Sequence, residues 1–507
     1  MVRSKIAPRL LVGLALVSTP AIAAPESTST LSAADKTKDA APTVNIEFER
    51  YKLDNGLEVI LHQDRTSPQV AVNLWYHVGS GNEVPGRSGF AHLFEHMMFQ
   101  GAKHIGEDVH FDILREIGAT GINGTTNSDR TNYFETVPSH HLETALWLES
   151  DRMGYLLDLL GEKSLENQQE VVRNERRQRY DNVPYGLDRF AVAAALYPEG
   201  HPYRYLTIGR HEDLEAAKIE DVRAFFTQWY VPSNATLTLA GDFDVNATKA
   251  MIDKWFGTFP ALPRPEVNEV LPPPLTANVR QEIADPFARL VRLHYTWHSP
   301  KSFGDGDIEL EALSTVLADN GWGRLYKTLV VEEELAQRVM SYQWGKGFSG
   351  EFHVVVDLKP GSSLERVESI INTEIARALS EPISSAELQR VKVQVESSFV
   401  WSLEELMSRV QRLQAFNHYT GDPNYTETYL KEIRALTPAS IQKAAQAWLA
   451  KPRAEIITVP APKEAGPKAS PKAGPSGPGK PIKGATTSMN TTTTKGPQGA
   501  VERRKQG

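Results

Sequence analysis

The sequence predicts an α+β fold made of two tandem units of roughly 200 residues each. The chain has 507 residues, more than one ordinary hydrophobic core accommodates. One order of predicted elements occurs twice: two strands, two helices, two strands, further helices and a last strand. A connector with six prolines, 260–274, separates the two runs. Sequence identity between the halves is not visible, so the predicted repeat depends on the order of elements alone.

The first unit begins with a predicted hairpin and leads into one strongly apolar helix. Strands over 46–53 and 58–63 are joined at Asp54-Asn55-Gly56, a sequence typical of a hairpin turn. A helix over 88–100 is apolar nearly all round and is therefore expected to be buried. The other predicted helices are 109–117, 140–160, 165–180, 187–196, 219–229 and 247–256, and the other strands are 69–77, 121–127, 131–137 and 235–240.

The second unit is predicted from the same kinds of periodicity. Its strands are expected over 279–283, 288–297, 337–344, 351–358 and 454–459, and its helices over 308–317, 324–331, 364–379, 386–419 and 439–449.

The two ends of the chain have compositions that do not predict a packed fold. Residues 1–23 carry a basic start, a short apolar run and Ala21-Ile22-Ala23, which is typical of a cleavable signal peptide and predicts a periplasmic or secreted protein. A low-complexity linker, 24–44, follows. The basic tail, 459–507, is rich in Pro, Gly, Lys, Ser and Thr and is expected to be disordered. The predicted domains are 45–259 and 276–458, with 260–275 as the linker.

Charge and composition exclude several functional classes. Subtracting the three positive charges of residues 1–23 and the net seven of residues 459–507 from the total of −8 leaves −18 for residues 24–458. A body this acidic argues against a nucleic-acid partner. The chain has no cysteine, which rules out thiol catalysis and thiolate metal ligands. No run of about 20 apolar residues predicts a membrane span.

His92-Leu93-Phe94-Glu95-His96 carries the strongest chemical signal. Residues four apart lie on one helix face, so both imidazoles can reach one metal ion. Glu95 lies at the edge of that face, where a carboxylate can act as general base in a zinc hydrolase of the H-x-x-E-H type. The alternative is three polar residues that coincide on a buried helix. Zinc needs a third protein ligand, and the sequence pattern leaves Glu166, Glu170 and Glu175 open.

The segment from Gly89 to Gly101 resembles the site helix of the pitrilysin/insulysin family of zinc metallopeptidases, in a two-domain form similar to the subunits of the mitochondrial processing peptidase. A second resemblance lies at Val171-Val172-Arg173-Asn174-Glu175, 79 residues after His96. The resemblance implies Glu175 as third zinc ligand, one zinc ion per chain and Glu95 as catalytic base. The family tends to carry an acidic residue two turns before this ligand, where this chain has Gln168.

The same resemblance implies an architecture and a way of holding substrate. It implies two homologous α/β-sandwich domains, each a mostly antiparallel sheet flanked by helices, that form half of a clamshell chamber. Family members bind peptides as an added strand on a sheet edge. Ile122-Asn123-Gly124-Thr125-Thr126 matches that strand, and Asn123 is the candidate for holding the substrate backbone. The alternative for Asn123 is an Asn-Gly turn.

The second half departs from the family pattern. Active second domains carry an arginine and, seven residues later, a tyrosine; the matching positions here are Val330 and Gln337. Arg324 and Tyr326 have the wrong spacing to replace that pair. The resemblance therefore predicts a heterodimer with a paralogue that supplies Arg and Tyr, with a homodimer as the alternative.

The sequence thus predicts a zinc metalloendopeptidase acting on peptides or unfolded polypeptides. The alternative function is a non-catalytic peptide-binding or assembly subunit with a dormant zinc site.

Overall fold

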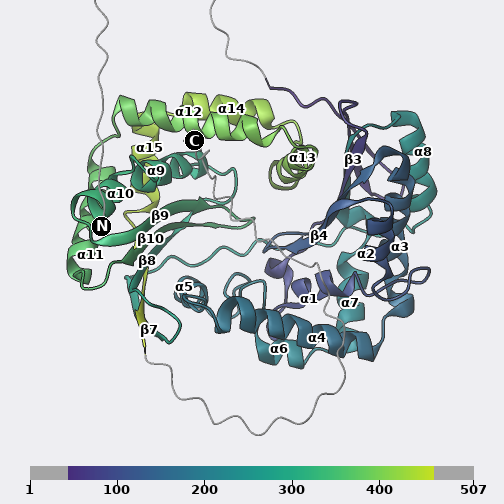
Figure 1. Ribbon diagram of the computed structural model, residues 1–507, viewed down its shortest axis with the longest axis horizontal. Helices are drawn as coiled ribbons and strands as arrows, with labels where there is room; N and C mark the ends of the chain where they lie inside the picture. Colours follow the sequence, from purple (N-terminus) through teal and green to yellow (C-terminus); the bar gives the residue numbers. More distant parts are fainter. Residues whose placement is uncertain (1–43, 462–507) are drawn as a thin grey trace, which may run out of the picture. The chain divides into compact units, whose positions relative to one another are not determined.

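The described part of the chain is residues 44–461 of a computed structural model (Figure 1). The predicted signal peptide lies outside the described residues, as do nearly all of the predicted linker 24–44 and tail 459–507. The last strand, β11, runs to Pro460, two residues into the range predicted as tail.

The first half supplies six strands and eight α-helices within the described residues. Their bounds are β1 Glu49–Lys52, β2 Glu58–Gln63, β3 Gln69–Tyr76, α1 Phe90–Met97, α2 Val109–Glu116, β4 Thr120–Thr126, β5 Thr131–Pro138, α3 Leu142–Leu159, α4 Glu162–Arg176, α5 Asp188–Leu196, α6 His211–Glu215, α7 Ile219–Trp229, β6 Ala235–Gly241 and α8 Val245–Phe256. Helix α4 continues into a π-helical turn, Arg177–Asp181.

The second half repeats this succession with five strands among the described residues. Its elements are β7 Val279–Asp285, β8 Arg292–Ser299, α9 Asp307–Ala318, α10 Arg324–Tyr326, β9 Ala336–Trp344, β10 Gly350–Leu358, α11 Leu364–Ser380, α12 Ser385–Ser402, α13 Leu406–Thr420, α14 Thr426–Ala435, α15 Pro438–Trp448 and β11 Ala454–Pro460. The described backbone over 260–275, between the halves, has no helix or strand.

The two sheets have the same strand order. The first sheet runs β1-β2-β6-β3-β5-β4 and the second runs β7-β11-β8-β10-β9, so the second sheet equals the first without β1. Each has one parallel pair, β2 with β6 and β7 with β11, and the remaining pairs are antiparallel. Helices flank both sheets (Figure 1). This shared topology confirms the predicted fold class of two tandem, mostly antiparallel α/β units.

Three helices differ from the sequence-based prediction. The single helix predicted over 386–419 is wrong, because α12 ends at Ser402 and α13 begins at Leu406. The short helices α6 and α14 were not predicted. The break after α12 redirects the chain, since α13 packs against β3 and β6 of the first sheet (Figure 1).

Helix α13 ties the second half to the first. Val410 packs with Ala71 and Ala240 on the first sheet. The side-chain amide of Gln414, fully buried, donates to the carbonyl oxygens of Asn73 at 3.2 Å and Thr236 at 2.7 Å. Because both halves contribute to this packing, the described residues fall within one compact unit.

Candidate metal centre

Helix α1, which carries the H-x-x-E-H motif, is fixed at its N-terminus by a glycine and a buried carboxylate. Gly89 has φ of +87°, and a Cβ there would lie 2.9 Å from the carbonyl oxygen of Ile208. Glu83 accepts hydrogen bonds from the backbone N–H of Gly89 at 3.0 Å and of Ala91 at 2.8 Å, which satisfies amides that the helix leaves unpaired. Burial raises the pKa of Glu83 to about 8. The first turn of the helix is therefore held in one place.

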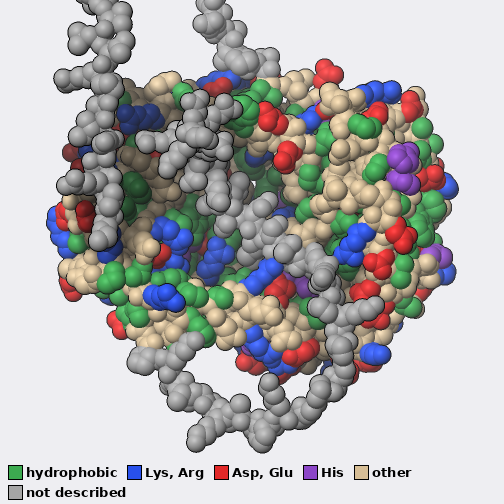
Figure 2. Space-filling view, viewed as in Figure 1, with side chains coloured by type: hydrophobic (Ala, Val, Ile, Leu, Met, Phe, Trp, Pro, Cys, Tyr) green, Lys and Arg blue, Asp and Glu red, His purple; other side chains and the backbone are tan. Residues whose placement is uncertain are grey.

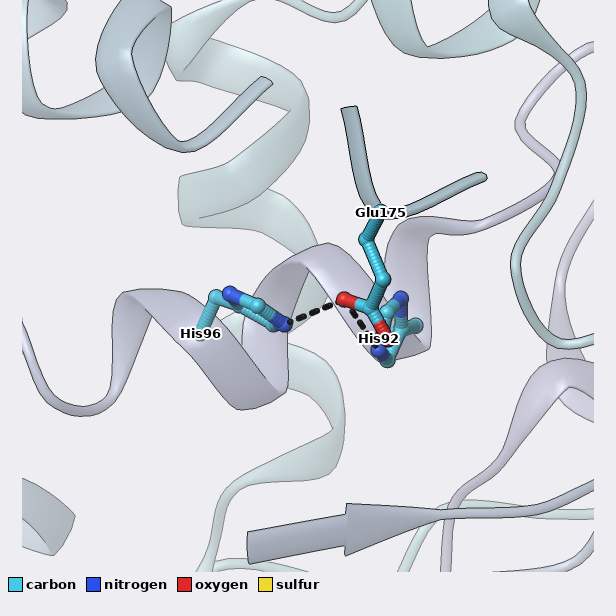
Figure 3. Close-up of side chains that lie close together, drawn as sticks. All are labelled: His92, His96 and Glu175. Atoms are coloured by element: carbon cyan, nitrogen blue, oxygen red, sulfur yellow. Dashed lines mark ion pairs between the residues drawn. The ribbon is translucent and has the colours of Figure 1, made fainter. Parts of the chain in front are cut away.

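Three candidate ligands converge from two helices (Figure 3). His92 and His96 project from α1, and Glu175 lies in the last turn of α4. The Oε2 atom of Glu175 is 3.3 Å from Nε2 of His96 and 3.7 Å from Nε2 of His92. Within the described residues, these three side chains form the group of His and acidic residues whose ligand atoms all lie within 4.8 Å of one another. The structure thus brings together the three predicted ligands.

The environment sets the charge of each ligand. Burial lowers the pKa of His92 to about 4, which keeps its imidazole neutral. Burial opposes the charged form of His96 as well, but its contacts with Glu175 and Glu95 raise its pKa above the usual range. Burial would raise the pKa of Glu175, yet the hydrogen bond to His96 and the nearby His92 and Arg179 lower it to about 2. The pocket therefore holds an ionised carboxylate beside two imidazoles.

These residues fit a zinc ion. Zinc–ligand bonds of about 2.0–2.1 Å in a tetrahedron place neighbouring ligand atoms roughly 3.3 Å apart, close to the separations found here. Two nitrogens and one carboxylate oxygen are the donor set of catalytic zinc sites. The Nε2 atoms of His92 and His96 are the ring nitrogens that approach Glu175, so they are the atoms that would bind the ion.

Glu95 lies beside this group and is held by the neighbouring strand β4. The hydroxyl of Thr126 donates a 2.6 Å hydrogen bond to Oε2 of Glu95. A Cβ at Gly124, two residues earlier on the strand, would lie 3.0 Å from Cγ of Glu95, so the strand backbone passes directly against this side chain. Burial raises the pKa of Glu95, which makes it a stronger proton acceptor than an exposed glutamate.

Strand β4 forms an edge of the first sheet. It is last in the strand order and pairs with β5 through Asn123 opposite Phe134, after a register shift between Thr120 and Asn123. Asn123 therefore lies within a strand, and not in the Asn-Gly turn that was the alternative. The side chain of Asn123 is half-buried, and the residue interacts with another residue of the described fold.

Gln168, at the position where the family resemblance leads us to expect an acid, is buried, and its interaction with His96 raises the pKa of that imidazole. It thus supports a ligand by a neutral contact in place of a charged one.

Arg324 is committed to contacts within its own half. Its guanidinium forms a bidentate pair with Glu387, with Nε to Oε1 at 2.7 Å and Nη2 to Oε2 at 3.0 Å. Gln337 is exposed at the start of β9, and Val330 is half-buried. Arg324 therefore does not substitute for an arginine at position 330.

Sequence reasoning missed two residues that contact the site. Arg179 forms a 2.9 Å ion pair with Oε1 of Glu175, and the i,i+4 spacing of the two residues on one helix could have revealed it. Thr126 could have been found from strand alternation, because it shares a strand face with Gly124.

The chain matches two family models. The model described as "Insulinase (Peptidase family M16)" matches residues 58–196, which contain all five candidate site residues. The model described as "Peptidase M16 inactive domain" matches residues 216–395 in the second half, where the motif does not recur.

Named relatives and solved structures agree with these matches. The zinc protease PqqE of Helicobacter pylori is 27% identical over 367 residues, covering 71% of this chain and 80% of that protein. A crystal structure of a protease from Helicobacter pylori matches with a TM-score of 0.77 at 24% identity, over 82% of this chain and 100% of that one. The periplasmic protease PqqL from Escherichia coli matches with a TM-score of 0.70 at 18% identity, over 83% of this chain but 48% of that one.

Proposed function

This chain belongs to peptidase family M16, and from that premise we propose that it is a zinc-dependent endopeptidase that hydrolyses peptides or unfolded polypeptides. The observation that carries the proposal is the approach of Glu175 Oε2 to Nε2 of His96 and His92, at 3.3 and 3.7 Å, with Glu95 beside them. The relatives named as zinc proteases support both the metal and the class of reaction.

In this proposal His92, His96 and Glu175 hold one zinc ion. Bound zinc supplies a Lewis acid that polarises a carbonyl and makes water a better nucleophile. Glu95 takes a proton from the attacking water and passes it to the leaving amine. Burial raises the pKa of Glu95, which makes it a stronger base than an exposed glutamate and favours the first of these proton transfers. The hydrogen bond from Thr126 holds one oxygen of this carboxylate in place.

The substrate would lie along the free edge of β4. A peptide added there as a further strand forms main-chain hydrogen bonds that do not depend on its sequence. Asn123, on that strand, would hold the substrate backbone. The closeness of Gly124 to Glu95 supports this path, since it brings the bound peptide bond next to the proposed base.

We further propose that the chain acts in a pair. Two observations support this: Val330 and Gln337 stand where an arginine and a tyrosine are expected, and the chain matches half of the length of PqqL. The favoured partner is a paralogous subunit that carries the Arg/Tyr pair, and the alternative is a second copy of this chain. The proposed location is the periplasm or the extracellular space, supported by the signal-like sequence of residues 1–23 and by the periplasmic relative. Among the described residues, no helix has the length and apolar character needed to span a membrane.

The decisive experiment compares the wild-type protein with Glu95→Gln, each alone and with its paralogue, on internally quenched peptides. The expected result is hydrolysis by the wild type and none by the variant, with about one zinc per chain in both by elemental analysis. Retained hydrolysis by the variant would refute Glu95 as the base. Stoichiometric zinc without hydrolysis under every condition would favour the dormant peptide-binding subunit.

A further inference from the structure

A cavity of about 420 Å³ lies where the π-helical turn after α4 and helix α5 meet strands β8, β9 and β10. Four arginines from four of these segments line it: Arg179, Arg189, Arg292 and Arg338. On the face drawn in Figure 2, Lys and Arg side chains gather over the region where the second sheet approaches α5. Residues 24–458 carry a net negative charge, so this concentration of positive charge differs from the rest of the protein.

Three of these arginines pair with two carboxylates: Arg179 with Glu175, and both Arg292 and Arg338 with Asp357. The lining itself contains one carboxylate, Asp188, whose Oδ2 is paired with Nδ1 of His294 at 2.7 Å. Arg292 and Arg338 share a single carboxylate, that of Asp357. Arg292 binds it through two hydrogen bonds of 2.7 and 3.2 Å, and Arg338 through one of 3.1 Å. The side chain of Arg338 is also 49% exposed, so part of its guanidinium faces solvent.

Tyr185, which packs against Arg292 in the wall of the cavity, is held in one conformation by its contacts. The guanidinium carbon of Arg292 lies 3.7 Å from the ring centroid of Tyr185. Tyr185 has φ of +60°, a conformation that non-glycine residues adopt only when their surroundings impose it. Two contacts hold it: its backbone N–H donates to Oδ2 of Asp285 at 2.6 Å, and its hydroxyl donates to the carbonyl oxygen of Leu290 at 3.0 Å. Strained backbone of this kind is concentrated at binding sites.

One arginine joins the cavity to the candidate metal centre. Arg179 lines the cavity, and its Nη1 atom is 2.9 Å from Oε1 of Glu175. The other carboxylate oxygen of Glu175 faces His96. One side chain, that of Arg179, therefore separates a ligand in the cavity from the metal ligands. A peptide of only a few residues can span this separation, since an extended peptide advances about 3.3 Å per residue.

We propose that this arginine-lined cavity is a subsite for a carboxylate of the peptide substrate, close in sequence to the bond that is cut. Guanidinium groups pair with carboxylates through two parallel hydrogen bonds, and Arg338 and Arg179 present partly exposed guanidiniums for this purpose. The inference rests on the proposed peptidase function and adds a substrate class to it. The carboxylate can come from an internal Asp or Glu or from the free C-terminus of the peptide.

The test uses Glu95→Gln protein, which keeps substrate uncut, and fluorescein-labelled peptides that differ at one position. Internal Glu is compared with Gln, and a free C-terminus with a C-terminal amide. We expect the carboxylate form to bind about tenfold more tightly in one of the two comparisons, the effect typical of one charge-assisted hydrogen bond. The comparison that shows the difference identifies the source of the carboxylate.

The second substitution, Arg338→Gln, should reduce that ratio to near one, and Arg338→Lys should restore part of it. Arg366→Gln is the matched control, because Arg366 is similarly exposed but pairs with Glu333 on another surface. Equal binding of the carboxylate and neutral peptides overturns the inference, as does a ratio that Arg338→Gln leaves unchanged. Because binding is measured without hydrolysis, these outcomes are distinct from a failure of the peptidase proposal, which appears as wild-type protein that cuts none of these peptides.

Discussion

Thr126 on strand β4 donates a 2.6 Å hydrogen bond to Oε2 of Glu95 on helix α1. This contact joins the edge strand of the first sheet to the proposed catalytic base, so the same element that would bind the substrate also orients the carboxylate. Both side chains are buried, with 6% of Thr126 and 3% of Glu95 exposed, and the contact is therefore shielded from water.

Replacing Thr126 by Val keeps the shape of the side chain and removes the hydroxyl. We expect kcat on a quenched peptide to fall roughly 10- to 100-fold with a smaller change in KM, because the loss of one hydrogen bond to a charged group costs about 1.5–3 kcal/mol. Zinc content should not change. Thr373→Val, at an exposed position on α11, is the control. An unchanged kcat in Thr126→Val would show that Glu95 does not depend on this contact.

Removing the metal should lower both activity and stability. A ligand that binds only the folded state stabilises it by about 2.7 kcal/mol at a hundredfold excess over its Kd. We therefore expect 1,10-phenanthroline to abolish hydrolysis and to lower the melting temperature by several degrees, and added zinc to reverse both effects.

The variant His92→Ala shows whether the chelator acts by removing zinc from this site or in some other way. It should be inactive, and its melting temperature should not respond to zinc or chelator. His140→Ala, which changes an exposed histidine after β5, should behave as the wild type. A zinc-dependent melting temperature in His92→Ala would mean that the metal binds elsewhere.

The sequence allowed the motif helix and the repeat of elements to be predicted, because both depend on local periodicity. His92, Glu95 and His96 lie on one short helix, so their spacing alone places them on one face. Glu175 is different: it lies 79 residues after His96, with the helices α2 and α3 and the strands β4 and β5 in between, and only the family resemblance selected it from three glutamates.

Features set by tertiary packing could not be predicted in the same way. The helix expected over 386–419 breaks after Ser402, since α13 turns to bury Val410 and Leu413 against the first sheet. No pattern in the sequence around α13 indicates that this helix packs against the first sheet. The cavity likewise collects arginines from both halves of the chain, and 159 positions separate Arg179 from Arg338.

Asp129 is a second point of contact between the halves, and its replacement should destabilise the fold. In the turn between β4 and β5, Oδ1 accepts hydrogen bonds from the hydroxyl of Tyr203 at 2.9 Å and the backbone N–H of Gly347 at 3.0 Å. Its Oδ2 accepts one from the hydroxyl of Tyr419 at 2.9 Å. We expect Asp129→Ala to lower the free energy of unfolding in urea by about 2–4 kcal/mol, because these donors and the hydroxyl of Ser128 lose a charged acceptor.

The matched control is Asp305→Ala, at an exposed position in the second half, which should change the free energy of unfolding by less than about 0.5 kcal/mol. Asp129→Asn keeps an acceptor oxygen and should lie between the two. If Asp129→Ala unfolds at the same urea concentration as the wild type, the contact between the halves does not depend on this carboxylate.

The pair formed by Arg324 and Glu387 should make stability depend on pH. The hydrogen bonds from Arg324 lower the pKa of Glu387 to about 2, against 4.5 for an ordinary glutamate. A carboxyl group whose pKa is lower in the folded state stabilises the fold fully above its unfolded pKa, and this contribution is lost as the pH falls towards the folded value. We therefore expect Glu387→Gln to cost on the order of 1–2 kcal/mol at pH 7, after allowance for the partial exposure of the pair.

The measurement is the free energy of unfolding in urea for wild type and Glu387→Gln between pH 7 and pH 3. Their difference should be constant down to about pH 5 and should shrink below it, because only the wild type loses the ionised carboxylate. A difference that stays constant to pH 3 would contradict the pairing. The same pair explains why Arg324 is not free to act on a substrate: its side chain is 8% exposed, and Nε and Nη2 of its guanidinium are bound to Glu387. Arg324 therefore does not supply the arginine missing at position 330, which agrees with the proposal that a partner subunit carries that arginine.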